Sequence, residues 1–370
     1  MANVAKKNHE PLLHIVKRDD MNTWQAWLVR IAAILVGFLV IGLMSSFMTK
    51  MSLGEVYNIM FRGTFGRLLE GKTTLLWRYL QQTSILLCLA LAVTPAFRMR
   101  FWNCGAEGQA LIGGLAAMVC MIEIGDAVPS GVLIAIIAVS SILAGAVWGL
   151  IPALFQAHYK TNETLFTLMM NYVATQIVAY YVYITGSGSG IIQPVKTGNL
   201  PLLFGQKYLL NIVIVAVLTI VLYIYMKYSK HGYEITVAGE SQNTARYIGI
   251  NVKKVIIRTM MISGAICGIA GMLLVAGTDH SINTNTVGGQ GFTAIMISWL
   301  GQFNPFIMTA MAGLVTFLET GAAKIADTCF LNSSYADIVS GIVILLVVGC
   351  EFFIRYSIKL RHSKKGGATA

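Results

Sequence analysis

The stretch Ala127–Ala157 reads AVPSGVLIAIIAVSSILAGAVWGLIPALFQA and contains no charged residue. A helix needs about 20 apolar residues to cross the hydrocarbon layer of a bilayer, so this stretch is long enough to span it. Backbone polar groups find no water in that layer, and a helix satisfies them within a single segment. The stretch therefore predicts a membrane-spanning helix.

The same uncharged character recurs along the chain. Apolar residues make up 56% of the sequence and charged residues only 12%, against about 25% charged residues in soluble globular domains. The blocks lack the alternation that membrane β-strands require. The sequence thus predicts an all-α polytopic membrane protein. Six further blocks carry no charge: Ile31–Thr49, Tyr79–Phe97, Thr164–Val195, Tyr208–Met226, Thr259–Thr278 and Ser281–Leu318.

The pattern predicts about ten spanning helices. The eighth is the weakest, because it is short and is introduced by Gly288, Gly289, Gln290 and Gly291. It suits a broken or re-entrant helix, which is tolerated only beside protein or a water-filled cavity. The predicted spans cover residues 24–48, 78–97, 107–124, 129–152, 164–185, 208–227, 256–277, 290–302, 304–321 and 337–356.

The basic residues indicate which side of the membrane each segment faces. With the N-terminus inside, nineteen of the 27 Lys and Arg residues fall in cytoplasmic segments and eight in outer ones. Cytoplasmic loops of membrane proteins carry such an excess. This predicts two cytoplasmic termini, with a tail at 1–23, a membrane domain at 24–356 and a basic tail at 357–370. It also accounts for the net charge of +11 without a nucleic-acid partner.

The segment 228–255 is the longest internal cytoplasmic connection in this topology. Ser241 is a suitable N-cap for a short helix over Asn243–Ile248, and Gly249 suits its C-terminal end. One interpretation is a simple connector. The other is a rigid, projecting element on which a partner protein docks.

A polar turn, Asn103-Cys104-Gly105-Ala106-Glu107-Gly108-Gln109, joins the second and third predicted spans. An acid beside a membrane segment is costly unless it is paired or faces water. The turn is therefore either a polar helix cap at the cytoplasmic face or a turn folded into the protein. In the fifth span, Asn171 either bonds another helix or lines a transport path. The candidate path residues are Asn103, Glu107, Gln109 and Asn171.

Two glycines in the seventh predicted span, Gly264 and Gly268, form a GxxxG pattern. Small residues at this spacing let two helices approach closely in a membrane. We expect a structural role for them, within one subunit or between subunits.

Signals of catalysis are absent from the sequence. It contains no GxxxxGK[ST], HExxH or GxSxG pattern and no cluster of metal ligands, so we predict no catalytic, cofactor-binding or metal-binding residue. This disfavours a membrane-embedded enzyme. A transporter driven by an ion gradient would favour ionisable residues buried in mid-span. Most of them here fall near the predicted span ends: Glu107, Glu123, Arg258, Glu319 and Glu351.

The polar segments resemble the ABC transporter permeases of the branched-chain amino acid, simple-sugar and nucleoside type. The turn at Asn103–Gln109 is similar to that family's N-I-G-A-E-G-Q signature, with Cys104 where the family usually has isoleucine. Three later segments continue the likeness in the family's order: Glu163 with Thr167, Met170, Asn171 and Tyr172; Val237–Glu240 with Ala245–Ile250; and Gly291–Phe292 with Gly301, Asn304 and Pro305.

The resemblance implies a transport subunit rather than an enzyme, located in a bacterial cytoplasmic membrane. It would pair with a second permease, identical or paralogous, above two ATP-binding cassette subunits that use the ATP. An extracytoplasmic binding protein or lipoprotein would deliver the substrate, and membrane lipid would surround the whole. The resemblance places coupling to the ATPase in the segment 228–255, at Gly239, Glu240, Asn243, Ala245, Arg246 and Gly249.

The resemblance also bears on the substrate. The long segment before the second span and the G-A-E-G-Q form are closer to the nucleoside-importing subgroup than to the shorter ribose permeases. We therefore expect a path for nucleosides, with simple sugars of the ribose or galactose type as the alternative.

Overall fold

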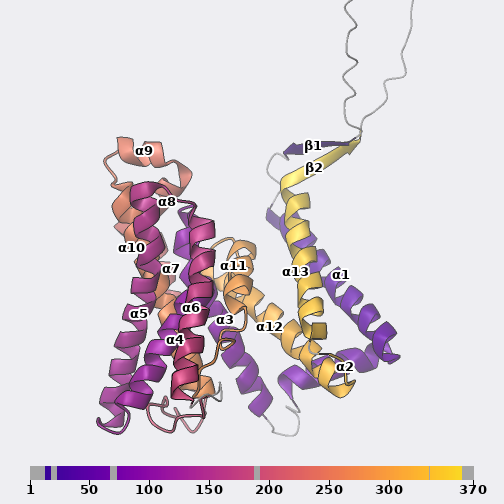
Figure 1. Ribbon diagram of the computed structural model, residues 1–370. Coiled ribbons are helices and arrows are strands. Elements are labelled where there is room, and N and C mark those ends of the chain that lie inside the picture. The colour runs from indigo at the N-terminus through magenta and orange to yellow at the C-terminus, as the bar shows by residue number, and fades with distance from the viewer. Residues whose placement is uncertain (1–12, 18–22, 67–72, 187–191, 333, 361–370) are drawn as a thin grey trace, which may run out of the picture. The chain divides into compact units, whose positions relative to one another are not determined.

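The structure is a computed structural model that describes residues 13–17, 23–66, 73–186, 192–332 and 334–360 (Figure 1). It consists almost entirely of helices, as the uncharged blocks predict. Its elements are β1 (Leu13–Lys17), α1 (Thr23–Thr49), α2 (Leu53–Phe65), α3 (Thr74–Arg98), α4 (Ala106–Glu123), α5 (Ser130–Tyr159), α6 (Glu163–Thr185), α7 (Leu209–Tyr228), α8 (Lys230–Glu240), α9 (Gln242–Tyr247), α10 (Val252–Leu274), the π-helix η2 (Val275–Asp279), α11 (Gln290–Leu300), α12 (Pro305–Thr328), α13 (Ser334–Arg355) and β2 (Tyr356–Leu360).

Eight helices of the described chain are long and apolar enough to cross a membrane: α1, α3, α4, α5, α6, α7, α10 with η2, and α12. The prediction of an all-α polytopic membrane protein is confirmed. α13 has 22 residues and coincides with the tenth predicted span. α11 has 11 residues, about 16 Å of helix against a hydrocarbon layer of about 30 Å, so it does not cross alone. The side on which the termini lie stays a prediction.

The strands β1 and β2 form an antiparallel pair, which the sequence analysis did not predict. Leu13 pairs with Leu360 and Lys17 with Tyr356. The pairing follows from the contact between α1 and α13, because these helices bring their flanking segments together (Figure 1). Of the two predicted tails, residues 1–12, 18–22 and 361–370 lie outside the described residues.

The chain divides into two compact units, Met1–Ile59 with Ile325–Ala370, and Met60–Lys324. In the first, the hydroxyls of Ser45 in α1 and Tyr335 in α13 are hydrogen-bonded, and the Tyr57 hydroxyl donates to the Phe38 carbonyl at 2.8 Å. Before α2, the Ser52 backbone N–H donates to the Glu55 carboxylate at 2.9 Å, which caps the helix start. The candidate site lies in the second unit.

Helices α3 and α10 form the interior of the second unit. Of the most apolar stretch of each helix, 83% is buried in α3 and 78% in α10, but only 28% in each of α5, α6 and α7. These three outer helices expose large apolar side chains such as Leu143, Met169 and Val217. Such a distribution suits a protein whose outer surface contacts lipid.

A seam of glycines holds α10 against α4 and α5. A Cβ on Gly264 would collide with the Gly145 carbonyl oxygen, and a Cβ on Gly268 with that of Ser141. Farther along the same stripe of α10, a Cβ on Gly271 would collide with the Ala110 carbonyl oxygen of α4. The close packing expected from GxxxG is therefore present, and it lies within this chain.

Candidate functional site

Asn103 organises the polar turn between α3 and α4. Its Oδ1 accepts hydrogen bonds from the Gly105 backbone N–H at 3.0 Å and from Gln109 Nε2 at 3.2 Å. Its Nδ2 donates to the Ser263 hydroxyl of α10 at 2.9 Å. Asn103, Gln109 and Ser263 are at most 1% exposed. The turn is thus folded into the protein and fastened to α10, because buried polar groups need such partners.

Helix α6 fastens the same turn from another side. Asn171 Oδ1 accepts from the Gly108 backbone N–H at 2.9 Å, and its Nδ2 donates to the Cys104 carbonyl at 2.8 Å. The Thr167 hydroxyl accepts from the Cys104 backbone N–H at 3.2 Å. These side chains satisfy backbone groups at the start of α4 that have no partner within the helix. Asn171 therefore bonds another helix, one of the two roles open to it from sequence.

Glu107 joins α4 to the short helix α11. One carboxylate oxygen accepts from the Gly289 backbone N–H and the other from the Gly291 backbone N–H, both at 2.8 Å. Gly289 has φ +79°, which favours glycine. A Cβ on Gly291 would lie 2.6 Å from the Glu107 backbone nitrogen, so glycine is also required there.

The structure thus gathers all four candidate path residues at one place. Asn103 and Gln109 bond each other, and Asn171 and Glu107 bond the turn and α11 respectively. Together they connect α4 with α6, α10 and α11. Their contact with a transported solute stays a prediction. The eighth predicted span corresponds to the short helix α11. Its start is hydrogen-bonded to Glu107, a side chain of α4.

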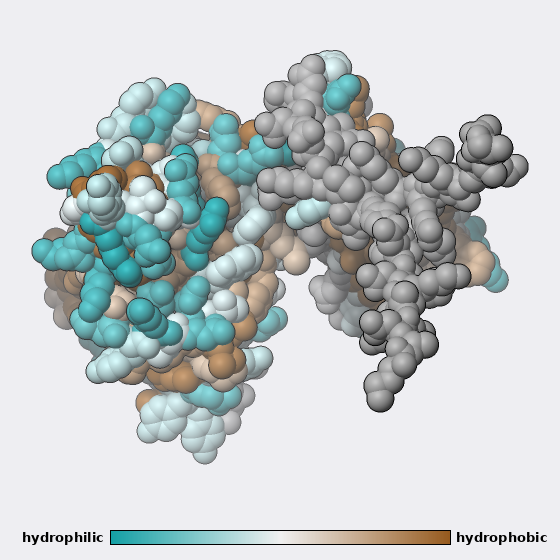
Figure 2. Space-filling view, turned by 90° about the horizontal axis from the view of Figure 1, so that it is seen from above, coloured by the Kyte–Doolittle hydropathy of each residue, from teal (hydrophilic) through white to brown (hydrophobic). Residues whose placement is uncertain are grey.

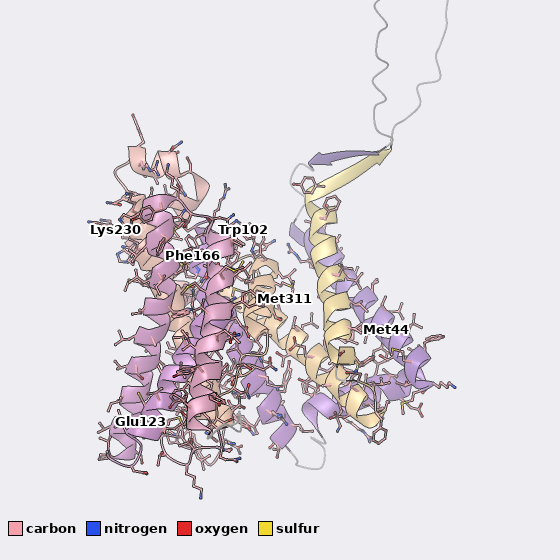
Figure 3. All side chains as sticks on the ribbon, in the orientation of Figure 1. Met44, Trp102, Glu123, Phe166, Lys230 and Met311 are labelled. Atoms are coloured by element: carbon pink, nitrogen blue, oxygen red, sulfur yellow. The ribbon has the colours of Figure 1, made fainter. Side chains whose placement is uncertain are left out.

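Four aromatic residues beside the turn escaped the sequence analysis: Phe97, Trp102, Trp299 and Phe303. The Trp102 and Trp299 rings stack with centroids 5.5 Å apart, and Phe97 meets each of them edge-on. Trp102 and Trp299 remain 45% and 38% exposed. In Figure 3, Trp102 lies toward the end of the unit that carries Lys230, and Glu123 marks the opposite end. No spacing in the sequence connects Trp102 with a residue so far along the chain.

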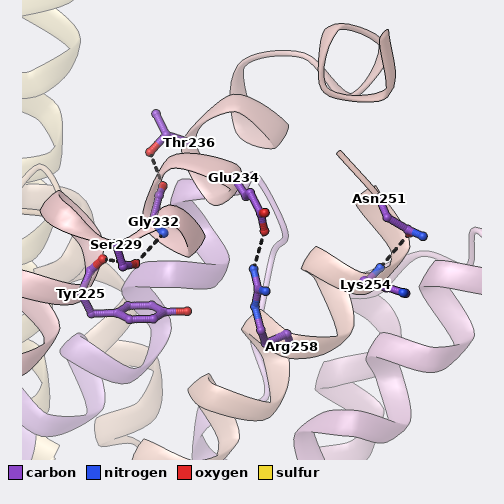
Figure 4. Close-up of polar contacts among 8 residues, drawn as sticks. All are labelled: Tyr225, Ser229, Gly232, Glu234, Thr236, Asn251, Lys254 and Arg258. Carbon is purple, nitrogen blue, oxygen red and sulfur yellow. Dashed lines mark hydrogen bonds and ion pairs between the residues drawn. The ribbon is translucent and has the colours of Figure 1, made fainter. Parts of the chain in front are cut away.

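The segment 228–255 is structured, and it contains two short helices where the sequence analysis expected one. Ser241 caps α9 by accepting from the Thr244 backbone N–H at 3.2 Å, as predicted. Gly249, with φ +85°, follows the end of α9. Helix α8 was not predicted; the Ser229 hydroxyl caps it by accepting from the Gly232 backbone N–H at 3.0 Å (Figure 4).

The predicted coupling residues divide into two groups. Gly239 and Ala245 are buried, and a Cβ on Gly239 would collide with the Arg98 carbonyl oxygen at the end of α3. The other four are exposed: Glu240, Asn243, Arg246 and Gly249. Next to them, Tyr247 is 93% exposed and Ile248 is also exposed. Neither residue was among the predicted coupling residues. Large apolar side chains left open on a short, anchored helix suit a docking surface.

An ion pair fixes α8 to α10. Arg258 Nη2 donates to the Glu234 carboxylate at 2.7 Å (Figure 4). This hydrogen bond is the largest cause of a pKa of Glu234 below the ordinary carboxyl value. The position of the segment is therefore coupled to α10, which packs against the polar turn through Ser263.

A groove of about 490 Å³ borders the same end of the unit. Its walls are the ends of α3 and α7, the start of α8 and the turn between α11 and α12, and they include Arg98 and Lys227. Gln302 and Phe303 in that turn have φ +50° and +59°, which is strained backbone for such side chains. Figure 2 looks down onto this end and shows hydrophilic side chains over α8 and α9, with hydrophobic ones at the margin.

The described residues contain no group of three or more His, Cys, Asp or Glu side chains that could hold a metal ion. The described site consists of buried hydrogen bonds, one carboxylate–backbone contact, one ion pair and an exposed helical element. Such parts can position helices and bind a partner.

Comparison with known proteins identifies related chains. The family described as "Branched-chain amino acid transport system / permease component" matches residues 75–348. The guanosine ABC transporter permease protein NupP of Bacillus subtilis is 28% identical over 92% of this chain and 97% of its own length. The glucose ABC transporter permease protein TsgB13 of Haloferax volcanii is 26% identical over 76% and 78%. The guanosine permease protein NupQ of Bacillus subtilis is 28% identical over 55% and 67%.

Proposed function

The chain belongs to the family of branched-chain amino acid transport system permease components, and from this premise we propose that it forms the nucleoside path of an ABC importer. The observation that carries the proposal is the anchored segment of α8 and α9. It is held by Gly239 against α3 and by the pair Glu234–Arg258, while Tyr247 projects. A rigid projecting element is what an ATPase needs to move the membrane helices.

The partners follow from this arrangement. Two ATP-binding cassette subunits dock on α9, which carries Asn243 and Arg246, and on the flanking residues Glu240 and Gly249, and they hydrolyse the ATP. A second permease, identical or paralogous, completes the path; two guanosine permeases from one organism, NupP and NupQ, support a paralogous pair. An extracytoplasmic binding protein or lipoprotein delivers the substrate. Both termini and α8 and α9 then face the cytoplasm of a bacterial cell.

Nucleosides are the preferred substrate class because NupP is similar over nearly the full length of both chains. The glucose permease TsgB13 matches a smaller share of this chain, and simple sugars are the second candidate. Both classes are uncharged and rich in hydroxyls. The buried amides Asn103, Gln109 and Asn171 hold the helices that border the path.

The substrate class is tested by competition. The complex is purified with its ATP-binding subunits and binding protein, reconstituted into ATP-loaded liposomes and given labelled guanosine. Unlabelled inosine or uridine is expected to suppress uptake, whereas ribose, glucose and leucine leave it unchanged. Suppression by a sugar instead of a nucleoside would transfer the assignment to the alternative class. Accumulation driven by a sodium or proton gradient without ATP would support a secondary transporter.

A further inference from the structure

Helix α6 differs from the other two outer helices of the second unit in the side chains that it exposes. Between the end turns of α5 and α7, every exposed residue is apolar, as at Leu143 and Val217. α6 instead exposes Gln176, together with Tyr172 and Tyr180, which are 68% and 67% exposed. Hydrocarbon offers no hydrogen-bond partner to an amide, so an amide is costly there. This face of α6 therefore meets something other than lipid.

Gln176 lies near the middle of its helix. α6 has 23 residues and is about 34 Å long, with Gln176 about 20 Å from its start and about 14 Å from its end. The hydrocarbon layer is about 30 Å thick, so the side chain reaches neither membrane surface. Its amide bonds no other group among the described residues. The partner of this amide thus lies outside the chain itself.

The opposite face of α6 fixes this orientation. Thr167 and Asn171 are buried there and bond the polar turn. A helix turns by about 100° per residue, which places Tyr172, Gln176 and Tyr180 on the other side. Because the inner face is anchored by hydrogen bonds, the polar stripe on the outer face is a fixed surface of the protein.

A groove of about 470 Å³ follows the stripe, and we call it the α6 groove. Its volume lies within the range of about 300–1,000 Å³ that is common for small-molecule sites. Gln176 lies one helical turn from each tyrosine, and side chains four residues apart are neighbours on a helix. A solute bonded to the amide therefore lies beside an aromatic ring. The walls of the α6 groove are Tyr172, Val173, Gln176, Ile177 and Tyr180.

A helix of a second permease is the competing occupant of the α6 groove. Membrane helices that pack closely meet through small residues, and the glycine seam of α10 does so within this chain. The exposed residues of α6, a helix that the structure describes in full, include no Gly, Ala or Ser. Bulky side chains with polar tips suit an open, water-filled surface better than a close helix contact.

We propose that the α6 groove lines the solute path and that Tyr172, Gln176 and Tyr180 bind the transported nucleoside. The proposal rests on the permease function proposed above and names the residues that meet the solute. The amide of Gln176 can donate to and accept from sugar hydroxyls and base edges. The flat tyrosine rings pack against the base or the sugar ring.

The first experiment measures the reactivity of Gln176→Cys in the complete complex in lipid vesicles. The probe is a charged methanethiosulfonate reagent, which modifies thiolates in water. Leu143→Cys is the matched control, because Leu143 lies in the middle of α5 and is 57% exposed. The wild type gives the background of the six native cysteines. Gln176→Cys is expected to react at least about tenfold faster than Leu143→Cys, and saturating guanosine is expected to slow its modification.

Three results of this experiment would overturn the proposal. Equally slow modification of both cysteines would place the α6 groove against lipid. Slow modification of Gln176→Cys in the complex, but fast modification in the isolated permease, would identify an interface with the partner permease. Fast modification that neither a nucleoside nor a sugar slows would identify a wet surface without a binding role.

The second experiment measures guanosine uptake by the reconstituted complex. Gln176→Leu is expected to lower the rate of uptake about tenfold, because the solute loses its hydrogen bonds to the amide. Val217→Leu on the apolar face of α7 is the control and should transport like the wild type. Unchanged uptake by Gln176→Leu would overturn the proposal. A wild type that transports neither nucleoside nor sugar would contradict the proposed function, while cysteine reactivity without added solute would still decide whether the α6 groove faces water.

Discussion

The guanidinium of Arg258 donates a hydrogen bond to the carboxylate of Glu234 at 2.7 Å and thereby ties α8 to the first turns of α10. Farther along α10, Ser263 bonds Asn103 in the polar turn. One helix thus connects the segment proposed to meet the ATPase with the turn that holds α4, α6 and α11.

Breaking this pair is expected to weaken coupling more than folding. Both side chains are partly exposed, 32% for Arg258 and 17% for Glu234, so Glu234→Gln should lower the free energy of unfolding by about 1 kcal/mol or less. Uptake per ATP hydrolysed should fall more strongly, because α8 is no longer held to α10. Simultaneous measurement of uptake and phosphate release in proteoliposomes checks this; an unchanged ratio would argue against a coupling role.

The same pair predicts a pH dependence of stability. The pKa of Glu234 is lowered from its ordinary 4.5, first by the Arg258 hydrogen bond. A lowered carboxyl pKa contributes stability that is fully present above the ordinary value and is lost as the pH falls through the lowered one. The melting temperature of the wild type should exceed that of Glu234→Gln at neutral pH and approach it in acid. A constant difference across this range would contradict the assignment.

The glycine seam is expected to tolerate no side chain. In Gly268→Val the branched side chain would meet the Ser141 carbonyl, and the backbone of α5 cannot move away without losing its packing. We expect loss of the monodisperse peak in fluorescence-detected size exclusion. Gly131→Val in α5, whose added Cβ meets no atom, is the control and should elute like the wild type.

Asn171 is expected to stabilise the polar turn. Asn171→Leu would leave the Gly108 N–H and the Cys104 carbonyl without their partner, at a cost of about 1–3 kcal/mol for each buried group. Thermal unfolding in detergent should show a clearly lower melting temperature. Gln176→Leu, an exposed amide on the same helix, should leave it nearly unchanged. Equal melting temperatures of the two variants would mean that the turn does not depend on Asn171.

The docking surface is expected to depend on Tyr247. Tyr247→Ala removes a side chain that is 93% exposed and should leave the fold intact while it weakens binding of the ATP-binding subunits by about tenfold or more. Tyr159→Ala, 75% exposed at the end of α5, is the control. Pull-down with titrated ATP-binding subunit measures both. The buried Ala245 is less informative, since a charge there would disturb folding first.

The sequence was sufficient for the features that depend on local chemistry. Uncharged blocks predicted the spans, Ser241 predicted the cap of α9, and Gly264 with Gly268 predicted close packing. The partners of the polar residues were not predictable, because they depend on tertiary contacts: Glu107 meets Gly289, and Trp102 meets Trp299, across about half of the chain. The pair of strands at the two ends was missed for the same reason.

The central claim, that this chain is the path-forming subunit of an ATP-driven nucleoside importer, is tested most directly by uptake of labelled guanosine. The complex is reconstituted with its ATP-binding subunits and binding protein, and liposomes loaded with ATP are compared with liposomes loaded with a non-hydrolysable analogue. Accumulation only with ATP, and its loss when this chain is omitted from the complex, is the expected result. Equal accumulation with the analogue, or without this chain, would contradict the account.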